Sequence, residues 1–527
     1  MPKRVVHIQA PTGGLYKRRG FQSQPPFTTP NCDNVRIDDS IDGRERIGSR
    51  PGVKILSSGT PPTGTGAVKL LSSVRWGAAG SEAETLVLAI ASVFSYSTNN
   101  GSTWSATSTG LRLSPSDINQ YTAADYHKKL YIANGTATFA EYDPSDNTLT
   151  QAPEVAEDGG EVPGDCEIIV RYRDRILLAG DRTNPQVWHM SRSGNALDWN
   201  TDATDVLSAV SGTTSDAGSI GEAIRCAIPH GDDCIIFGCD SSIWTLRSDP
   251  NFGGTLDNLS QRIGIIDKHA WARTPEGWLF FLTQDGIYAM QPGCGDVPIS
   301  VSRERLPEEL IAVDRTTTVV SMDYDIRFRG IHLWLTPESG TATHYFLDVK
   351  QLLTGDSGTT ATFWPQTLTS NPGFQPYSAY TYEPLVGANI SSSLMGGRNG
   401  VLYVFDKSEN AIDEPSYVEI GPLSTTGQTG QYFTGTLDIL HAVLSDQSNT
   451  VTWKVRSGET PEAAFDATTE YEGKWDNVRN NHTVRIRLRN PYYIIRIENL
   501  DSSNYNRWSV ESLTAVVNPR GKQRFRR

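Results

Sequence analysis

Residues 278–290 read Trp278-Leu279-Phe280-Phe281-Leu282-Thr283-Gln284-Asp285-Gly286-Ile287-Tyr288-Ala289-Met290. Two apolar runs flank an Asp-Gly pair in this stretch. Such a pair between apolar runs predicts a tight hairpin, because both central turn positions favour residues that tolerate positive φ. The stretch therefore predicts two buried, adjacent β-strands.

Similar apolar runs occur seven times along the chain. They begin at Leu86, Leu130, Ile176, Cys234, Trp278, Ile331 and Val401. Successive starts are 44, 46, 58, 44, 53 and 70 residues apart. A period in the forties is the size of a four-stranded propeller blade. The sequence thus predicts an all-β protein built on a β-propeller of about seven blades, with long loops where the spacing exceeds the period.

Composition and punctuation divide the 527 residues into five segments. The 47 glycines and 29 prolines fit many turns, and residues 484–497 alternate as strands with one solvated face. The predicted segments are an extended N-terminal arm at 1–52, the propeller at 53–412, a linker at 413–430, a small β-sandwich-like domain at 431–519 and a basic tail at 520–527.

One turn in the first repeat carries a further signature of the fold. Residues 97–104 read Ser97-Thr98-Asn99-Asn100-Gly101-Ser102-Thr103-Trp104. This octapeptide resembles the Asp-box of sialidase-type propellers, with Asn99 in place of the aspartate. Asn99 can accept from turn amides, Gly101 supplies an unusual dihedral, and Trp104 is expected to pack beneath. Ser97, Asn99, Gly101, Thr103 and Trp104 are therefore predicted to form a structural turn.

Charge and hydropathy restrict the partners of the protein. The formal net charge is −13 and the pI about 5.3, which argues against sequence-independent nucleic-acid binding. An acidic wall would instead let DNA pass without sticking. The N-terminus lacks the apolar stretch of a secretory signal, and no run of 18 apolar residues predicts a membrane span. We expect no stable membrane insertion.

The six cysteines predict no metal centre and no disulfide scaffold. The densest group is Cys226, His230, Cys234 and Cys239, which lacks the paired Cys-x2-Cys spacing of zinc sites. Reduced, buried thiols are the expected state of these cysteines. We expect no cofactor.

The sequence also predicts no catalytic site. Walker loops, Gly-x-Ser-x-Gly elbows and His-Glu-x-x-His helices are absent from it. The alternative functions are a propeller glycoside hydrolase, which needs two converging carboxylates, and a carbohydrate-binding tail protein that acts on host surface glycans. Charged candidates for a hydrolase are Asp181, Asp240, Asp285, Glu276, Arg175, Arg225, Arg247, Arg329 and Arg398.

Both ends of the chain resemble one group of viral proteins. The N-terminal features are Ala10-Pro11-Thr12-Gly13-Gly14-Leu15, Pro25-Pro26, Asn31-Cys32-Asp33-Asn34-Val35 and Gly43-Arg44-Glu45-Arg46-Ile47-Gly48-Ser49-Arg50-Pro51-Gly52. The C-terminal features are Arg489-Asn490-Pro491-Tyr492-Tyr493-Ile494-Ile495-Arg496-Ile497 and Trp508-Ser509-Val510-Glu511-Ser512-Leu513. In this order they resemble the tail nozzle family of short-tailed bacteriophages, also called tail tubular protein B or stabilisation protein.

This resemblance implies a structural virion protein and no enzyme. It implies a homohexameric ring in the phage tail, assembled in the bacterial cytoplasm, that extends the portal–adaptor channel. Such a ring retains packaged DNA and lets it pass on ejection. The implied partners are further copies of the chain, the head–tail adaptor protein and tail fibre or needle proteins, with DNA only in passing.

The arm is expected to dock on a neighbouring subunit or the adaptor. Its predicted docking residues are Leu15, Phe21, Phe27, Arg44, Arg46 and Arg50. The apolar three would be buried across the interface, and the arginines would make charge-assisted contacts. The functional channel would then run between subunits, and the centre of each propeller would serve only as structure.

Overall fold

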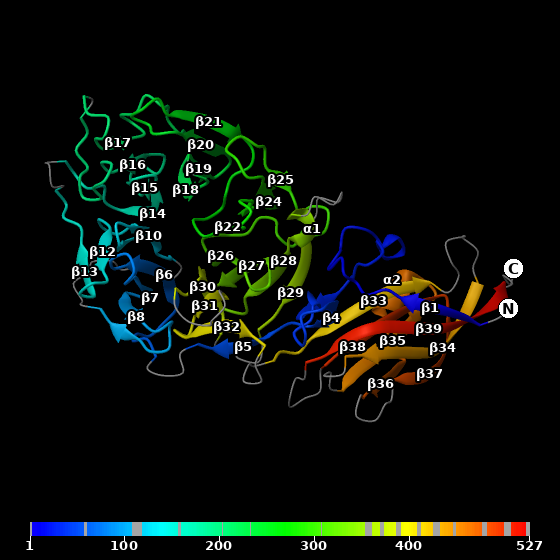
Figure 1. Ribbon diagram of the computed structural model, residues 1–527. Coiled ribbons are helices and arrows are strands. Elements are labelled where there is room, and N and C mark those ends of the chain that lie inside the picture. The colour runs from blue at the N-terminus through cyan, green and yellow to red at the C-terminus, as the bar shows by residue number, and fades with distance from the viewer. Residues whose placement is uncertain are drawn as a thin grey trace.

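Two all-β domains lie side by side in the computed structural model, a propeller and a β-sandwich (Figure 1). The residues that the structure describes are 3–56, 61–107, 119–155, 160–202, 204–231, 233–306, 308–353, 361–368, 374–385, 392–407, 413–424, 433–445, 450–476, 482–499 and 507–522. Among them, no helix has the length and apolar character needed to cross a membrane.

Seven four-stranded antiparallel sheets form the blades of the propeller in the described part of the chain. The first six blades are β6–β9 (Val68–Trp76, Ala83–Ile90, Val93–Ser97, Ser105–Ala106), β10–β13 (Thr122–Tyr126, Lys129–Ala133, Ala140–Asp143, Thr148–Gln151), β14–β17 (Cys166–Tyr172, Arg175–Asp181, Trp188–Met190, Val210–Ser211), β18–β21 (Ile224–Pro229, Cys234–Cys239, Ile243–Arg247, Thr255–Ser260), β22–β25 (Trp271–Arg273, Leu279–Thr283, Gly286–Met290, Ile299–Ser300) and β26–β29 (Thr318–Asp325, Gly330–Pro337, Thr343–Asp348, Thr362–Gln366). The predicted all-β fold with seven propeller repeats is confirmed.

The predicted hairpin at residues 278–290 is β23 and β24, which pair from Leu279↔Met290 to Thr283↔Gly286. Of its Asp-Gly pair only Gly286 has positive φ, at 102°. Six of the seven apolar runs fall on the second strand of a blade. The seventh lies on a third strand, β32 (Leu402–Asp406), and this lengthens the last spacing to 70 residues.

The seventh blade is completed by a strand from the opposite end of the propeller segment. Its order is β30 (Pro376–Tyr382), β31 (Ser392–Gly397), β32 and β5 (Gly52–Ile55). β5 pairs antiparallel with β32, and Val53 lies opposite Phe405. β30 in turn lies beside β6 of the first blade. The ring of blades is thus closed by hydrogen bonds between residues about 350 positions apart in the sequence.

The sandwich consists of two antiparallel sheets that draw on both ends of the chain. One has the order β3–β4–β39–β34–β37, with β1 paired to β39, and the other β2–β33–β38–β35–β36. The strands are β1 (Arg4–Ile8), β2 (Cys32–Asp33), β3 (Val35–Asp38), β4 (Glu45–Ser49), β33 (Tyr417–Ser424), β34 (Phe433–Leu444), β35 (Val451–Gly458), β36 (Tyr471–Trp475), β37 (Thr483–Asn490), β38 (Tyr492–Glu498) and β39 (Ser509–Lys522). Short helical turns are η1 (Phe21–Ser23), α1 (Lys350–Leu353) and α2 (Pro461–Asp466).

The predicted segment boundaries need three corrections. The arm at 1–52 is not a separate element, because β1 to β4 are strands of the sandwich. The segment at 413–430 is not a linker where it is described, because β33 occupies much of it, while residues 425–430 lie outside the described residues. The sandwich therefore extends beyond 431–519. Of the basic tail at 520–527, the first three residues continue β39 and the rest lie outside the description.

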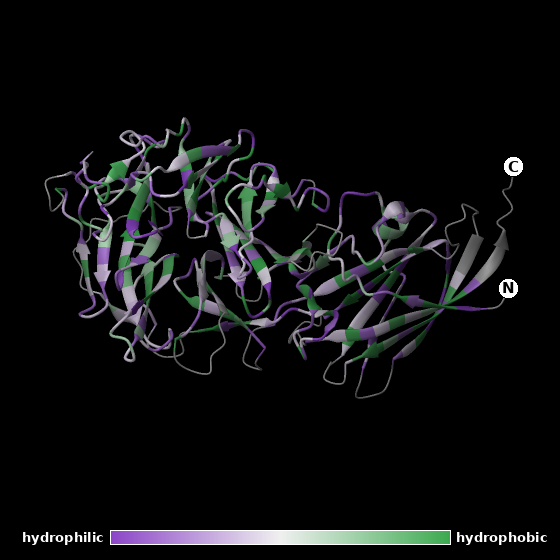
Figure 2. Ribbon diagram, turned by 45° about the horizontal axis from the view of Figure 1, so that its top comes forward, coloured by the Kyte–Doolittle hydropathy of each residue, from purple (hydrophilic) through white to green (hydrophobic). Residues whose placement is uncertain are grey.

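Apolar cores lie between neighbouring blades and continue into the sandwich. Leu70, Val87 and Phe94 of the first blade pack with Tyr121 and Leu130 at the second. A single larger cluster joins the fourth, fifth and sixth blades to the core of the sandwich. Figure 2 shows hydrophobic colour concentrated in the strands and polar colour in many connecting loops. Because one core spans both domains, we treat the chain as one structural block.

The Asp-box-like turn is confirmed between β8 and β9. Asn99 Oδ1 accepts from the amide of Thr103 at 2.9 Å, and Ser97 Oγ accepts from the amide of Gly101 at 3.0 Å. Gly101 has a φ of 80°, and the Trp104 indole donates to the Gly101 carbonyl at 3.0 Å. Trp104 packs with residues of the seventh blade. The turn therefore stabilises the contact between the first and seventh blades, where the ring closes.

Gly48 of β4 is expected to tolerate no side chain. A Cβ there would lie 2.6 Å from the Trp508 carbonyl oxygen and 2.9 Å from Asp39 Cβ. We expect Gly48→Ala to lower the free energy of unfolding by about 1–3 kcal/mol through overpacking. Urea denaturation measures this loss. Gly20→Ala is the control, because a Cβ there meets nothing within 4 Å, and an equal loss in both variants would contradict the prediction.

Candidate assembly interface

The N-terminal segment lies along the outer strand of the sixth blade before it enters the sandwich. The amide of Leu15 donates to the Phe363 carbonyl at 3.0 Å, and the amide of Asn34 donates to the Pro365 carbonyl at 3.1 Å. Leu15 is 2% exposed and belongs to the shared core. The segment is therefore fixed to β29 of its own chain by backbone hydrogen bonds at two separate points.

Arg46 is bonded within the sandwich. It forms ion pairs with Asp39, Asp42 and Glu511, and its side chain is 4% exposed. Asp39 also accepts from the amides of Ile41, at 2.9 Å, and of its neighbour at 42. These contacts join the β3–β4 turn to β39. Such a buried network is specific in geometry and uses the Nε, Nη1 and Nη2 atoms of Arg46 within its own chain.

Arg50 and Arg36 fill the junction between the two domains. Arg50 donates to Asn34 Oδ1 at 2.7 Å and to the Pro51 carbonyl at 2.6 Å. The guanidinium carbon of Arg36 lies 3.9 Å from the ring centroid of Phe346 and 5.0 Å from that of Phe405. Burial lowers the pKa of Arg36 to about 9. Both cations stabilise the junction by cation–π and hydrogen-bond contacts.

The predicted docking set therefore divides in three. Leu15, Arg46 and Arg50 are buried in their own chain, so their assignment to an intersubunit contact is wrong. Phe21 is partly buried and its ring stacks on Phe465 of α2 with a centroid distance of 4.4 Å. Two further residues remain exposed, namely Phe27, at 47%, and Arg44. For Phe21, Phe27 and Arg44 the docking role stays a prediction.

Two sheet edges that the predicted set omitted are also exposed. β37 pairs only with β34 among the described strands, and its residues Arg485, Arg487 and Arg489 are all exposed on alternate positions. At the other end of this sheet, β1 exposes Val5 at 63% and Val6 at 43%. The alternation of arginine with apolar residues at 484–489 was the sequence signal for the first edge. An open edge presents unpaired backbone N–H and C=O groups to which another chain can bind, and the arginines of β37 would favour a partner that carries negative charge.

Side chains from three blades meet at one end of the propeller axis. Lys268 and His269 precede the fifth blade, and residues 119–121 precede the second. Lys268 Nζ donates to Asn119 Oδ1 at 2.6 Å, and His269 Nε2 lies 2.8 Å from the Tyr121 carbonyl oxygen. Gln120 Nε2 donates to the Tyr377 carbonyl of the seventh blade. These bonds cross the axis and occupy it, as expected for a disc whose centre is structural.

His269 is expected to make stability fall with acidification. Burial, followed by the charge of Lys268, lowers the pKa of His269 to about 4 from 6.5. In the unfolded chain this histidine binds a proton below about pH 6.5, whereas in the folded chain it binds one only below about pH 4. The stability that comes from the neutral imidazole is therefore complete above pH 6.5 and is lost as the pH falls toward 4. Between pH 7 and pH 5 this group should cost about 2 kcal/mol of unfolding free energy.

The variant His269→Gln isolates this contribution. His332 also has its pKa lowered to about 4, mainly by burial, whereas burial raises the pKa of Asp323 to about 7. Only the difference between the parent and the variant, measured by urea denaturation at pH 7 and pH 5, reports His269. The parent should lose more stability than the variant on acidification. Equal losses would contradict a neutral His269 in the fold.

Most of the charged residues considered for hydrolysis are used in separate local contacts, and Glu276 is exposed in the turn between β22 and β23. Arg225 forms a bidentate pair with Asp240 at 2.7 and 2.9 Å. Arg175 pairs with Asp249 at 3.0 Å, and Asp285 accepts from the Tyr288 hydroxyl at 2.9 Å. The remaining arginines bind backbone carbonyls or lie in turns, as follows: Arg247 to Cys294, Arg398 to Pro337 and Gly340, and Arg329 in the β26–β27 turn. Of the proposed acids and arginines, only Asp181 lines the pocket in the third blade.

The cysteines differ from expectation at one pair. Cys234 of the fourth blade and Cys294 of the fifth form a disulfide with a Cα–Cα distance of 6.2 Å, so the prediction that Cys234 is a reduced thiol is wrong. Cys226 and Cys239 are buried free thiols, and burial raises the pKa of Cys239 to about 12. No group of three metal-ligating side chains gathers among the described residues.

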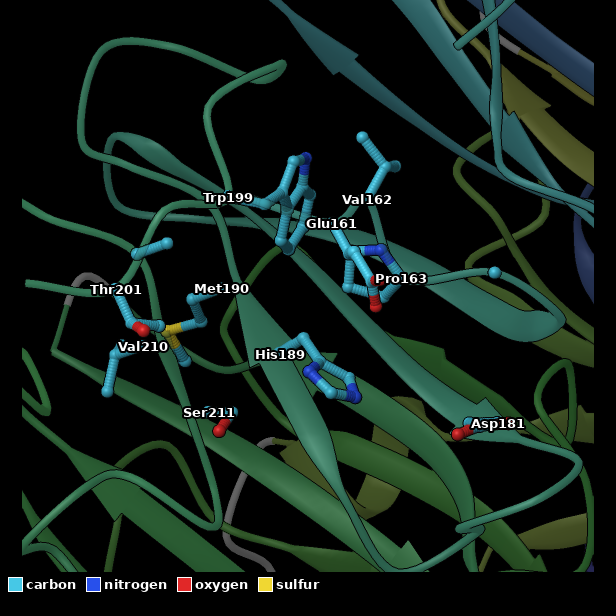
Figure 3. Close-up of a pocket in the computed structure, with 12 residues that line it drawn as sticks. Glu161, Val162, Pro163, Asp181, His189, Met190, Trp199, Thr201, Val210 and Ser211 are labelled. Atoms are coloured by element: carbon cyan, nitrogen blue, oxygen red, sulfur yellow. The ribbon is translucent and has the colours of Figure 1, made fainter. Parts of the chain in front are cut away.

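A pocket of about 290 Å³ lies in the third blade. It forms where residues 160–164 meet the described parts of the segment between β16 and β17, residues 191–202 and 204–209. The length of this segment, 191–209, accounts for the 58-residue spacing. The side chains around it are shown in Figure 3, where the His189 ring stands among them. Its lining residues include Glu161, Asp181, His189, Trp199, Thr201 and Ser211.

The chain matches no protein family and no curated protein in sequence. Solved structures with a partly similar fold are YCF48 bound to D1 peptide (12% identity, 69% of this chain and 99% of that chain, TM-score 0.41), an extracellular domain of a hybrid two-component system from B. thetaiotaomicron (11%, 83% and 49%, 0.43) and BBS1N in complex with ARL6DN (10%, 69% and 98%, 0.38). At these scores, none of the three indicates what this chain does. The blades and sheets themselves define the chain as a β-propeller protein with a β-sandwich domain.

Proposed function

We propose that this protein is a structural subunit of a tail nozzle in a short-tailed bacteriophage. Copies would form a homohexameric ring in the virion, below the portal and adaptor, that retains packaged DNA and lets it pass on ejection. The observation that carries the proposal is the use of residues 4–55. The segment that resembles nozzle proteins joins sandwich and propeller into one block and closes the seventh blade.

The occupied propeller axis supports a building block whose work is done by its outer surfaces. DNA would pass between subunits, and the net charge of −13 would limit its adhesion to the wall. The two sheet edges, β37 and β1, together with Phe27 and Arg44, would contact neighbouring copies or the adaptor. In a ring these contacts are heterologous and closed. Tail fibre or needle proteins would dock on the same outer surfaces, and no catalytic residue is needed.

Electron microscopy of the purified protein, alone and with its adaptor complex, tests the ring. We expect six-fold rings for the parent protein. The triple variant Arg485→Glu, Arg487→Glu and Arg489→Glu should reduce ring formation at unchanged thermal stability, because these exposed side chains make no ion pair among the described residues.

Arg171→Glu is the matched control for this variant, since Arg171 is an exposed strand arginine on the propeller, 3.7 Å from Asp125. It should leave the rings intact. A protein that remains monomeric with its adaptor present would sink the proposal. Rings that persist in the triple variant would exclude β37 as the contact edge.

A further inference from the structure

Residues 191–202 and 204–209 are held by several polar contacts, although the propeller does not need them for closure. Arg175, whose side chain is 1% exposed, donates to the carbonyls of Ser191 at 2.8 Å, Ser208 at 2.6 Å and Val206 at 3.1 Å. Arg192 pairs with Asp205 at 2.7 Å. Long segments without regular structure that are nevertheless well ordered are typically functional. The pocket beside this segment is therefore preformed.

Trp199 gives the pocket an apolar surface with no free donor. Its indole nitrogen already donates to the Ala196 carbonyl at 2.9 Å, and its ring lies 6.2 Å from that of Phe139. Gly160 backs it closely, because a Cβ at Gly160 would lie 2.7 Å from the Trp199 carbonyl carbon. Trp199 is 5% exposed and belongs to a buried cluster, so it is fixed in place and borders the pocket with a narrow apolar edge, beside which the C–H groups of a sugar ring can lie.

The polar side chains that line the pocket favour a ligand with several hydrogen-bond donors. The carboxylates of Glu161 and Asp181 only accept when ionised, and neither has an ion pair among the described residues. Among the residues that the structure describes, neither ring nitrogen of His189 has a hydrogen-bond partner. Burial lowers the pKa of His189. A neutral imidazole donates from one nitrogen and accepts at the other. Ser211 adds a hydroxyl.

The charge of this lining excludes anions. Two carboxylates without a cationic partner would repel a phosphate or an acidic sugar. Hydroxyl groups, in contrast, donate to carboxylates and can also accept from the imidazole. A volume of about 290 Å³ is at the small end for ligand pockets and fits one sugar ring.

We propose that this pocket binds one neutral pyranose ring of a glycan. Asp181 and Glu161 accept from the hydroxyls of the ring, His189 contributes one donor and one acceptor, and the exposed edge of Trp199 borders the C–H groups of the ring. The pocket binds without hydrolysis. This site goes beyond the proposed nozzle function and does not depend on ring formation, so either can fail alone.

The experiment measures binding of methyl glycosides of glucose, galactose and mannose, of L-rhamnose and of N-acetylglucosamine by ligand-observed NMR and calorimetry on the full chain. We expect at least one to bind with a Kd on the order of 1 mM, the range of a single small ring. Gly164→Phe should then weaken binding at least about tenfold by filling the pocket. A Cβ at Gly164 meets nothing within 4 Å, so the variant should fold normally.

Gly221→Phe is the matched control, because its Cβ also meets nothing within 4 Å and it does not line the pocket. It should bind as the parent does. Asp181→Asn should weaken binding about fivefold or more, whereas Asp257→Asn, on the rim of the fourth blade, should not. The proposal is overturned if no sugar of the panel binds, if binding survives Gly164→Phe, or if the diamine putrescine binds in place of the sugars.

Discussion

A protein that lacks residues 1–56 is expected not to fold, rather than to fold and fail only in assembly. The deletion removes four strands of the sandwich and the strand that closes the seventh blade. Leu15, Val35, Ile47 and Val53 are each at most 4% exposed. Burial of each such side chain contributes about 1.5–3 kcal/mol to the free energy of unfolding. Together with the lost strand pairing, their sum is comparable to the whole unfolding free energy of a typical domain, about 5–15 kcal/mol.

Soluble yield, circular dichroism and limited proteolysis measure this effect. The matched control keeps the segment and carries Phe27→Ala, which changes an exposed side chain of the same segment and should leave the unfolding temperature nearly unchanged. Addition of a peptide of residues 1–56 during refolding should restore part of the folded yield. A truncated protein with a cooperative unfolding transition close to that of the parent would contradict the integrating role of the segment.

Arg175→Leu is expected to cost about 3–5 kcal/mol of unfolding free energy. The change leaves Asp249 without its buried partner and several backbone carbonyls of segment 191–209 without donors. Because unpaired polar groups in the interior pay a desolvation cost, the loss should far exceed that of an exposed charge. The segment should also become susceptible to proteolysis, and sugar binding in the adjacent pocket should disappear.

Urea denaturation and time-resolved proteolysis compare this variant with Arg171→Leu. Arg171 lies on β14 of the same blade, and its ion pair with Asp125 is exposed on both sides, so its loss should cost less than about 1 kcal/mol. Similar losses in the two variants would show that the buried hydrogen bonds of Arg175 do not hold the segment.

The propeller could be predicted from the sequence because its signals are local. Each hairpin is recognised in the sequence by two apolar runs and a turn. The hydrogen bonds of the Asp-box-like turn at 97–104 all join residues within an eight-residue stretch. The different strand position of the seventh run also has a local cause. The second strand of that blade, Ser392–Gly397, is rich in small residues, so the third strand gave the stronger apolar signal.

The sandwich boundaries could not be predicted in the same way. Residues of β1 pair with partners more than 500 positions away, as in Arg4↔Val517, and no local pattern encodes such pairing. The arm looked extended because its strands are short and separated by turns. Of its predicted apolar anchors Leu15 is buried, but the surface it packs on belongs to the same chain. Arg46 and Arg50 were misassigned for this reason.

The pocket shows a third limit. The spacing of 58 residues between the apolar runs at Ile176 and Cys234 indicated a long loop. This spacing does not reveal that residues 160–164 pack against the loop. Likewise, contacts across the propeller axis bring His269 beside Tyr121 from positions 148 residues apart. Sequence reasoning identified where irregular segments lie, and the three-dimensional structure was needed to say what they contact.

A cryo-electron microscopy reconstruction of the purified chain with its adaptor complex tests the central claim most directly. The account predicts a ring whose channel runs between subunits. In every subunit Gln120, Lys268 and His269 should occupy the propeller axis, and residues 4–55 should lie within their own chain. An isolated monomer, or N-terminal strands exchanged into a neighbouring subunit, would contradict it.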